Sequence, residues 1–146
     1  MVKKFYTLKW LLVCTLDKRI LFVSKAYSGH THDFTIFKYI FGGLDLSAYR
    51  LHVDAGFMGI KKAVKFQAIW IPYKASKNKP LNEWQKLVNK LFAHVRIVIE
   101  NVIAKIKSFF ILRIENRTRQ KIKFASSFQL CAALANFKTI IYQLSH

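Results

Sequence analysis

Only seven acidic residues occur among the 146 residues of the chain, so each carboxylate that could take part in chemistry can be considered in turn. Four have ordinary explanations in turns, in loops or in the first turn of a helix, where an acid interacts favourably with the helix dipole: Asp17, Asp45, Glu83 and Glu115. Asp33 or Thr31 can cap a short helix. Asp54 and Glu100 are therefore the candidates for a functional role.

Asp54 ends a short apolar run in the segment LHVDAGFMGI, residues 51–60. Side chains at the ends of strands in α/β sheets project into the crevice where ligands bind. Gly56 lets the backbone turn away without a side chain in that crevice. The alternative is that Asp54 only caps the turn that follows it.

Glu100 lies within IVIENVIAKI, a segment with the pattern of a long helix. The alternative to a functional role is an ion pair with Arg96, one helical turn earlier. Carboxylates from a strand end and a helix edge suit Mg²⁺ or Mn²⁺, and two such ions can stabilise the attacking and leaving oxygens of a phosphoryl transfer. A third carboxylate is normally needed, and none before Asp54 supplies it convincingly.

The charge of the chain favours a polyanionic partner. Lys and Arg number 25 against 7 acids, which gives a formal charge of +18 and strong self-repulsion. We expect nucleic acid, while an anionic membrane surface and simple solubility are the alternatives. No run approaches the ~20 apolar residues of a membrane span, and the basic N-terminus lacks a signal-peptide pattern, so we expect a cytoplasmic protein.

The apolar patterns predict strands and helices in the order β β α β α β, followed by helices. Residues 7–15 and 20–25 predict a hairpin, residues 34–40 a helix that ends at Gly42 and Gly43, and residues 49–54 a third strand. A short helix over 59–66 and a strand over 67–73 follow. Residues 82–112 predict a helix with a break near Ala93 and His94, and residues 127–144 a final helix. This pattern predicts one α/β domain.

One broad apolar stripe runs along the long helix. Taking about 100° per residue, its members fall within about 140° of one another: Val95, Val98, Ile99, Val102, Ile103, Ile106, Phe109 and Phe110. The two cysteines, Cys14 and Cys131, lie in apolar surroundings without metal-ligand spacing, and we expect buried free thiols.

Four segments in order resemble the C-terminal half of DDE-type insertion-sequence transposases, the DDE superfamily endonucleases close to insertion sequence five: YSGHTHDFTIFK, LHVDAGFMGI, IPYKASKNKPLNEWQKLVNK and RIVIENVIAKIKSFFIL. The resemblance covers nearly the whole chain. It implies an RNase H-like α/β fold, a mixed sheet with flanking helices, in which three acids hold two divalent metal ions, Mg²⁺ or Mn²⁺. Water or a 3′ hydroxyl then attacks a DNA phosphate at the transposon end.

The resemblance also implies roles for individual residues. The second Asp of the family matches Asp54, its Glu matches Glu100, and Arg96 and Lys107 stand at the positions of its basic partners. The first catalytic Asp would fall before Met1. We therefore expect residues 1–146 to form one partial catalytic domain that lacks its first strand, is weakly stable or associating, and cleaves little DNA without an upstream half.

The expected partners are the transposon ends and the target DNA, and we expect no membrane partner. We expect the complete protein to form a homo-oligomer and to act in the bacterial cytoplasm, at the nucleoid. The predicted DNA contacts are all basic: Lys61, Lys62, Lys74, Lys77, Lys79, Arg96 and Lys107. Two other readings stay open. The chain could be a non-catalytic nucleic-acid-binding protein, or the product of a decayed transposon.

Overall fold

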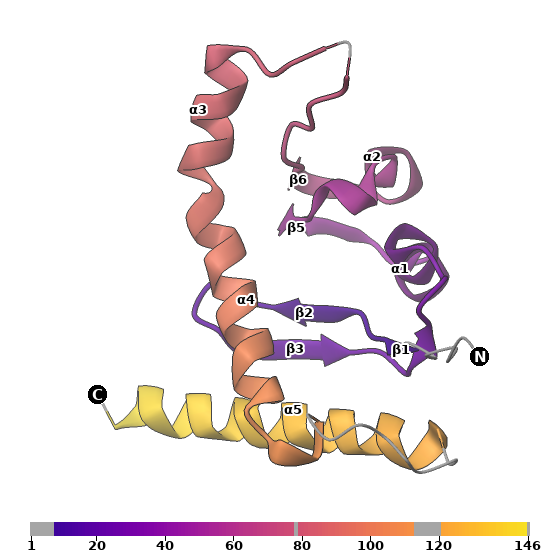
Figure 1. The fold of residues 1–146 in the computed structure, drawn as a ribbon, viewed down its shortest axis with the longest axis vertical. Coiled ribbons are helices and arrows are strands. Elements are labelled where there is room, and N and C mark those ends of the chain that lie inside the picture. The colour runs from indigo at the N-terminus through magenta and orange to yellow at the C-terminus, as the bar shows by residue number, and fades with distance from the viewer. Residues whose placement is uncertain (1–7, 78, 113–120, 146) are drawn as a thin grey trace, which may run out of the picture. The chain divides into compact units, whose positions relative to one another are not determined.

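The computed structural model describes residues 8–77, 79–112 and 121–145, and for residues 121–124 it describes the backbone alone. These residues form two compact units, each built from two separate stretches of chain. The first unit holds residues 8–9 and 27–94, and the second holds 10–26 with 95–112 and 121–145. The boundary between His94 and Val95 falls within a helix, α4 (Figure 1).

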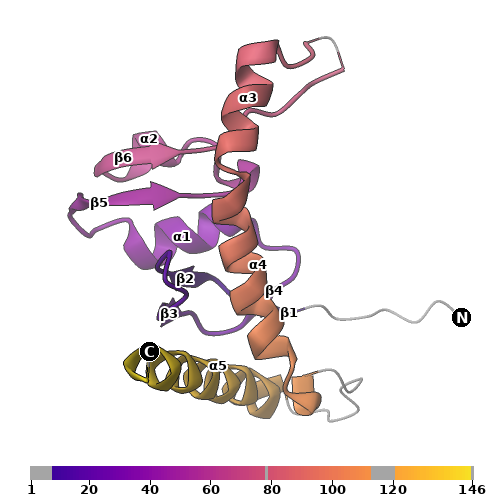
Figure 2. The ribbon, with the colours of Figure 1, turned by 90° about the vertical axis from the view of Figure 1, so that its left-hand side faces the viewer.

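A parallel pair of strands is the centre of the first unit. Strand β5 (Leu46–His52) pairs in parallel with β6 (Phe66–Trp70). Parallel neighbours cannot be joined by a tight turn, so the chain crosses over between them. The crossover contains the 3₁₀ turn η1 (Ala55–Phe57) and the short helix α2 (Ile60–Ala63), and Figure 2 shows α2 beside β6.

Helix α1 (Asp33–Phe41) supplies much of the core of this unit. Ile36 and Phe37 of α1 are buried together with Ile60 of α2. The Phe37 ring centroid lies 6.1 Å from that of Phe57 in η1 and 6.2 Å from that of Phe66 in β6. This packing ties the crossover to the strands. Beside it, β1 (Leu8–Lys9) and β4 (Tyr27–Ser28) form a short antiparallel pair.

Helix α3 (Glu83–Leu91) begins at a capping box in which Asn82 Oδ1 accepts from the Gln85 backbone at 2.7 Å and Gln85 Oε1 accepts from the Asn82 backbone at 3.1 Å. The helix ends at Phe92, and α4 (Ala93–Lys107) follows directly. The predicted break in the long helix is confirmed, at Phe92.

The second unit contains the predicted hairpin and the predicted final helix. Strands β2 (Leu12–Cys14) and β3 (Ile20–Val23) pair antiparallel, with a register shift between Val13 and Cys14. Helix α5 (Lys121–Leu144) begins six residues before the predicted start, and the turn η2 (Phe110–Leu112) follows α4. The core of this unit joins α4 to α5 through a small set of buried residues: Val102, Ile106, Cys131, Ala132 and Ala135.

The predicted apolar stripe is confirmed except at its end. Val102 and Ile106 are buried, and the other members up to Phe109 are partly buried. Phe110 is 74% exposed, so its assignment to the stripe was wrong. The helical spacing stops at Lys107, and Phe110 belongs to η2, where the backbone no longer follows 100° per residue.

Both cysteines are free thiols, as predicted, with Cys131 buried and Cys14 partly buried. Burial raises the pKa of both thiols, and the nearby Asp17 adds to the rise in the pKa of Cys14.

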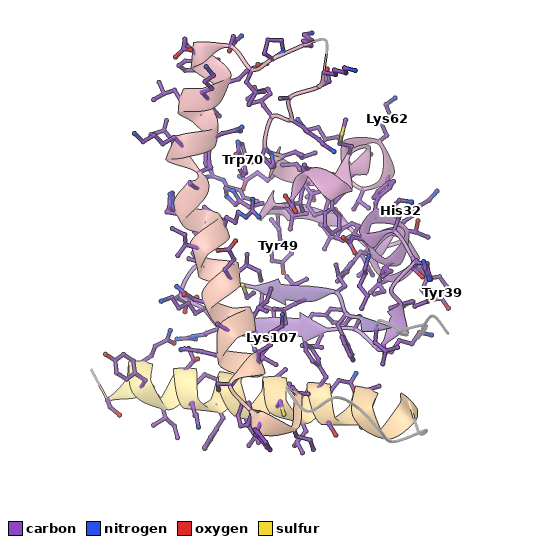
Figure 3. The ribbon with its side chains drawn as sticks, in the orientation of Figure 1. His32, Tyr39, Tyr49, Lys62, Trp70 and Lys107 are labelled. Atoms are coloured by element: carbon purple, nitrogen blue, oxygen red, sulfur yellow. The ribbon has the colours of Figure 1, made fainter. Side chains whose placement is uncertain are left out.

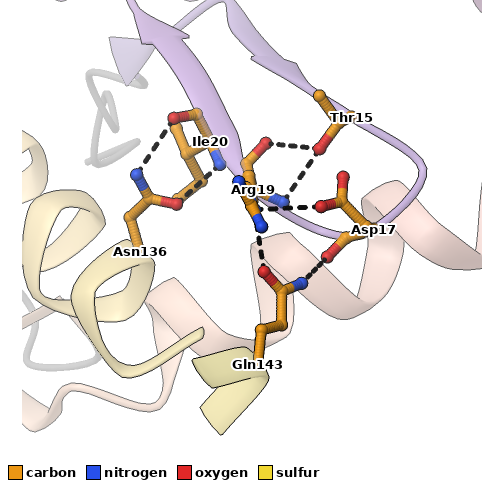
Figure 4. Close-up of polar contacts among 6 residues, drawn as sticks. All are labelled: Thr15, Asp17, Arg19, Ile20, Asn136 and Gln143. Carbon is orange, nitrogen blue, oxygen red and sulfur yellow. Dashed lines mark hydrogen bonds and ion pairs between the residues drawn. The ribbon is translucent and has the colours of Figure 1, made fainter. Parts of the chain in front are cut away.

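Side chains of α5 hold the backbone of the hairpin (Figure 4). Asn136 Oδ1 accepts from the Ile20 N–H at 2.8 Å, and Asn136 Nδ2 donates to the Ile20 carbonyl at 3.1 Å. Gln143 accepts from Arg19 Nε at 2.8 Å and donates to the Asp17 carbonyl at 2.7 Å. These bonds satisfy backbone groups next to the register shift, where the strand pairing is irregular.

The mixed α/β class is confirmed, and the order β β α β α β is present with two further short strands. The described strands form three two-stranded sheets. A single RNase H-like sheet, a missing first strand and a single partial domain over residues 1–146 stay predictions. Within the described residues, no helix has the length and apolar character needed to span a membrane.

We expect Asn136→Leu to lower the free energy of unfolding by about 1–3 kcal/mol, because it leaves the partly buried Ile20 backbone without its partners. Gln143→Leu is the matched control, since its bonds are exposed and should contribute less. Urea denaturation measures both. Equal losses in the two variants would contradict a special role for Asn136.

Asp17 should make stability depend on pH. Hydrogen bonding with Thr15 lowers the pKa of the Asp17 carboxyl below its ordinary value of 3.8, and the charge of Arg19 adds to this. The folded state therefore binds the proton less readily than the unfolded state, so the stabilisation is present above pH 3.8 and is lost as the pH falls through the lowered pKa. Asp17→Asn should lower the midpoint of urea unfolding at about pH 7 and have little effect at about pH 2. An equal effect at both pH values would rule out the carboxylate as its source.

Candidate active site

Asp54 lies directly after the parallel pair and is exposed. Val53, the residue before it, still donates its backbone N–H to the Trp70 carbonyl at 3.1 Å, so Asp54 marks the point where β5 leaves β6. Its Oδ1 accepts from the Ala55 N–H at 2.8 Å and caps η1. The capping alternative is thus observed. A carboxylate has two acceptor oxygens, so the cap leaves capacity for a further ligand.

The glycine that needs its conformational freedom in this turn is Gly59, not Gly56. Gly59 has φ 95°, a left-handed conformation that side chains disfavour, and it precedes α2. Among the described glycines only Gly59 has a positive φ. A Cβ at Gly56 would make an ordinary contact, 3.7 Å from Asp33 Oδ2. Gly56 therefore does not explain the turn in the way the sequence suggested.

Asp33 lies beside the turn that follows Asp54, since its carboxylate approaches Gly56. It is the first residue of α1, where His32 is the N-cap without a side-chain bond. Asp33 Oδ1 is 3.2 Å from Lys9 Nζ, which also donates to the Thr31 carbonyl at 3.0 Å. Asp33 thus has an ion pair rather than the predicted capping role. The sequence gives no local signal for this arrangement, because the three segments are far apart along the chain.

Glu100 lies on α4 in the second unit and pairs with Arg96 one turn earlier. Glu100 Oε1 is 3.0 Å from Arg96 Nε, and the side chains are 59% and 71% exposed. The ion-pair alternative is therefore observed as well. An exposed pair of this spacing stabilises a helix by only about 0.3–0.5 kcal/mol, so it would not prevent Glu100 from binding another cation.

The predicted DNA-contacting residues are all exposed. Lys61 and Lys62 lie on α2, and Figure 3 shows Lys62 directed away from its helix. Lys74, Lys77 and Lys79 lie in the segment between β6 and α3. The remaining two, Arg96 and Lys107, are on α4.

The first unit therefore holds Asp54 and five of the predicted lysines, and the second holds Glu100 with its two basic neighbours. Within the part of the chain that the structure describes, no group of three or more His, Cys, Asp or Glu side chains could hold a metal ion. A site that joins Asp54 to Glu100 stays a prediction. Glu115 lies outside the described residues.

An aromatic cluster near the ends of β5 and β6 was missed from the sequence. The rings of His52, Trp70 and Phe92 have centroids 4.6–5.9 Å apart and line a hollow of 370 Å³. Burial lowers the pKa of His52, and the charge of His94 lowers it further. The signal that could have revealed the cluster is that His52 and Trp70 each end a strand of the same parallel pair.

We expect Asp54→Ala to lower the free energy of unfolding by about 1 kcal/mol, because it removes the cap on the Ala55 N–H. Asp54→Asn should leave stability nearly unchanged, since an amide oxygen can accept the same bond. Thermal melts of both variants measure the difference. Equal loss in the two would show that the charge of Asp54, rather than its cap, stabilises the turn.

Comparison with known proteins gives the family. The family model described as DDE superfamily endonuclease matches residues 1–136. A protein of Microchaete diplosiphon, named as a probable transposase for insertion sequence element IS702, is 33% identical over 111 residues, which are 75% of this chain and 38% of that protein. No solved structure matches the chain. The match over almost the whole length shows that the chain belongs to the DDE superfamily endonucleases.

Proposed function

We propose that this chain supplies Asp54 and Glu100 to a metal-dependent site that cleaves and transfers DNA strands during transposition. Membership of the endonuclease family supports a role in transposition. The observation that carries the assignment is the placement of Asp54. It is an exposed carboxylate at the end of a parallel strand, and no cation in the described part of the chain pairs with it.

The two side chains fit a hard divalent cation. Carboxylate oxygens are the ligands that Mg²⁺ and Mn²⁺ prefer, and both carboxylates are exposed. When bound, such ions supply charge stabilisation to the attacking and leaving oxygens of the phosphate. The chain itself would orient the ligands. The Ala55 N–H fixes Oδ1 of Asp54, and Arg96 holds Glu100 through a weak pair that a metal can replace.

The third carboxylate of the site, we propose, comes from outside these 146 residues. Of the described acids other than the two proposed ligands, Asp17, Asp33 and Glu83 are ion-paired. Asp45 accepts from the Ser47 N–H in its own turn. On this proposal an upstream transposase half completes the site, and the 146 residues alone cleave little DNA.

DNA is the proposed partner, both as transposon ends and as target. Lysines around the turn after Asp54 and in the segment before α3 would bind phosphates and release counterions: Lys61, Lys62, Lys74, Lys77 and Lys79. Arg96 and Lys107 would bind phosphates near Glu100. The formal charge of +18 favours this partner over neutral ligands. A homo-oligomer of the complete protein belongs to the same proposal.

A non-catalytic DNA-binding function is the second candidate. It is favoured by one observation: Asp54 and Glu100 each have a partner that needs no metal, the Ala55 N–H and Arg96. In that case the lysines bind DNA and the two carboxylates only stabilise their own elements.

The deciding experiment joins this chain to an upstream transposase half and measures cleavage of transposon-end DNA with and without Mg²⁺. Glu100→Gln should reduce cleavage about a thousandfold, because losing one ligand removes several kcal/mol of charge stabilisation. Glu83→Gln is the matched control, since Glu83 is an exposed helix residue paired with Lys86 at 2.9 Å.

Full cleavage in Glu100→Gln would remove Glu100 from the site. No cleavage by the joined protein, with DNA binding that depends on salt but not on Mg²⁺ or on Asp54→Asn, would establish the non-catalytic function instead.

A further inference from the structure

The segment between β6 and α3, which lies near the top of Figure 1, contributes most of the lining of a small open hollow in the first unit. Its volume is 180 Å³, equal to about six waters, which suits a single small group and not a duplex. The residues that line it include an aromatic ring, two lysines and two neutral polar side chains: Tyr73, Lys74, Ser76, Lys79 and Gln85. None of the described lining residues is acidic.

Tyr73 is held in place by the helix that follows the loop. Asn89 Oδ1 accepts from the Tyr73 N–H at 3.0 Å, and Asn89 Nδ2 donates to the Tyr73 carbonyl at 2.9 Å. The backbone of Tyr73 is thus fixed on both sides, while 45% of the residue stays exposed. Because the backbone is held, the ring of Tyr73 starts from a fixed point, and less conformational freedom is lost when a planar partner binds there.

One of the two lysines that line the hollow closes a turn, and the other precedes this turn. Ser76 and Lys79 exchange two backbone hydrogen bonds, both 3.1 Å long. Lys74 precedes this turn and Lys79 closes it, and both are exposed. The closed turn fixes where the Lys79 side chain begins, and the two lysines bring two positive charges to the lining of the same hollow.

Gln85 has a free donor at the lining. Its Oε1 accepts from the Asn82 N–H in the capping box, so the amide orientation is set and the NH₂ group is left as the donor. A ligand that carries a hydrogen-bond acceptor would therefore find a donor in the lining of the hollow, in addition to the charges of the two lysines.

We propose that this hollow receives the base of one unpaired nucleotide of DNA, stacked on Tyr73, with the phosphate of that nucleotide outside the hollow between Lys74 and Lys79. The proposal rests on DNA being the partner, as proposed above. Surface lysines alone attract any DNA equally, whereas an aromatic ring in a hollow of this size favours a base that is out of the duplex. Base stacking on an aromatic side chain tolerates any base, so the proposed site would distinguish unpaired from paired DNA and would not distinguish one base from another.

The test measures binding of the 146-residue chain to labelled DNA by fluorescence anisotropy in EDTA, with a single strand and its duplex compared. The chain should bind the single strand more tightly. Tyr73→Leu should weaken single-strand binding about tenfold and leave duplex binding nearly unchanged, whereas Tyr73→Phe should keep the preference. Lys79→Gln should lower the salt slope for the single strand by about 0.7.

Two variants serve as matched controls. Tyr49→Leu removes another exposed tyrosine, on β5, and Lys90→Gln removes a lysine at the far end of α3. Both should keep the single-strand preference. Circular dichroism checks that each variant is folded. If Tyr73→Leu does not fold, a single strand with abasic sites tests the same contact on the unchanged chain, and it should bind about tenfold more weakly.

Single-strand binding that is unaffected by Tyr73→Leu, or by abasic sites, would overturn the proposal, as would an equal loss on both forms of DNA in Tyr73→Leu. The measurement needs neither metal nor cleavage. Its failure would therefore leave the proposed cleavage site untouched, and a failure of cleavage would leave this binding site standing.

Discussion

The parallel pairing of β5 with β6 is the constraint on which the rest of the first unit depends. Because parallel neighbours cannot be joined by a tight turn, about thirteen residues must cross from the end of one strand to the start of the other. This crossover carries Asp54 at its first turn and Lys61 and Lys62 on its helix. Packing of Phe37 against Phe57 and Phe66 then fixes the crossover to both α1 and the pair.

Because basic residues greatly outnumber acids, it is informative whether each carboxylate has a basic partner. In a chain with a formal charge of +18, an exposed acid finds a basic neighbour easily, and four of the described acids have one. Asp45 and Asp54 are the described acids without such a partner, and Asp45 is bound to the amide of Ser47 in a loop. Asp54 stands at a strand end instead. The lack of a cation partner for Asp54 within the described residues therefore supports its proposed role as a ligand more strongly than its exposure does.

The elements could be predicted because their causes are local. Alternating or helical spacing of apolar residues placed the hairpin, α1, α3, α4 and α5. The break in the long helix was predicted near Ala93 and His94, next to its observed place at Phe92. Phe110 was misplaced because spacing cannot tell where a helix stops. For the site, the sequence left the cap and the metal ligand open at Asp54. The observed cap uses only one of the two carboxylate oxygens of Asp54, and the other oxygen can still bind a metal ion. The fold is therefore compatible with both roles, and a test of activity distinguishes them.

Contacts between distant residues could not be read from the pattern. Asn89 holds the Tyr73 backbone from 16 residues away, and Lys9 of β1 pairs with Asp33 at the start of α1. Each requires the fold before the two side chains meet. For the proposed binding of DNA these contacts matter, because charge alone gives affinity without selectivity and a long flexible lysine does little to define the shape of a site. Selectivity needs groups whose positions are fixed before the ligand arrives. In the proposed nucleotide site, Tyr73, whose backbone is held by Asn89, meets that requirement beside two lysines, whereas the lysines of α2 would contribute charge alone.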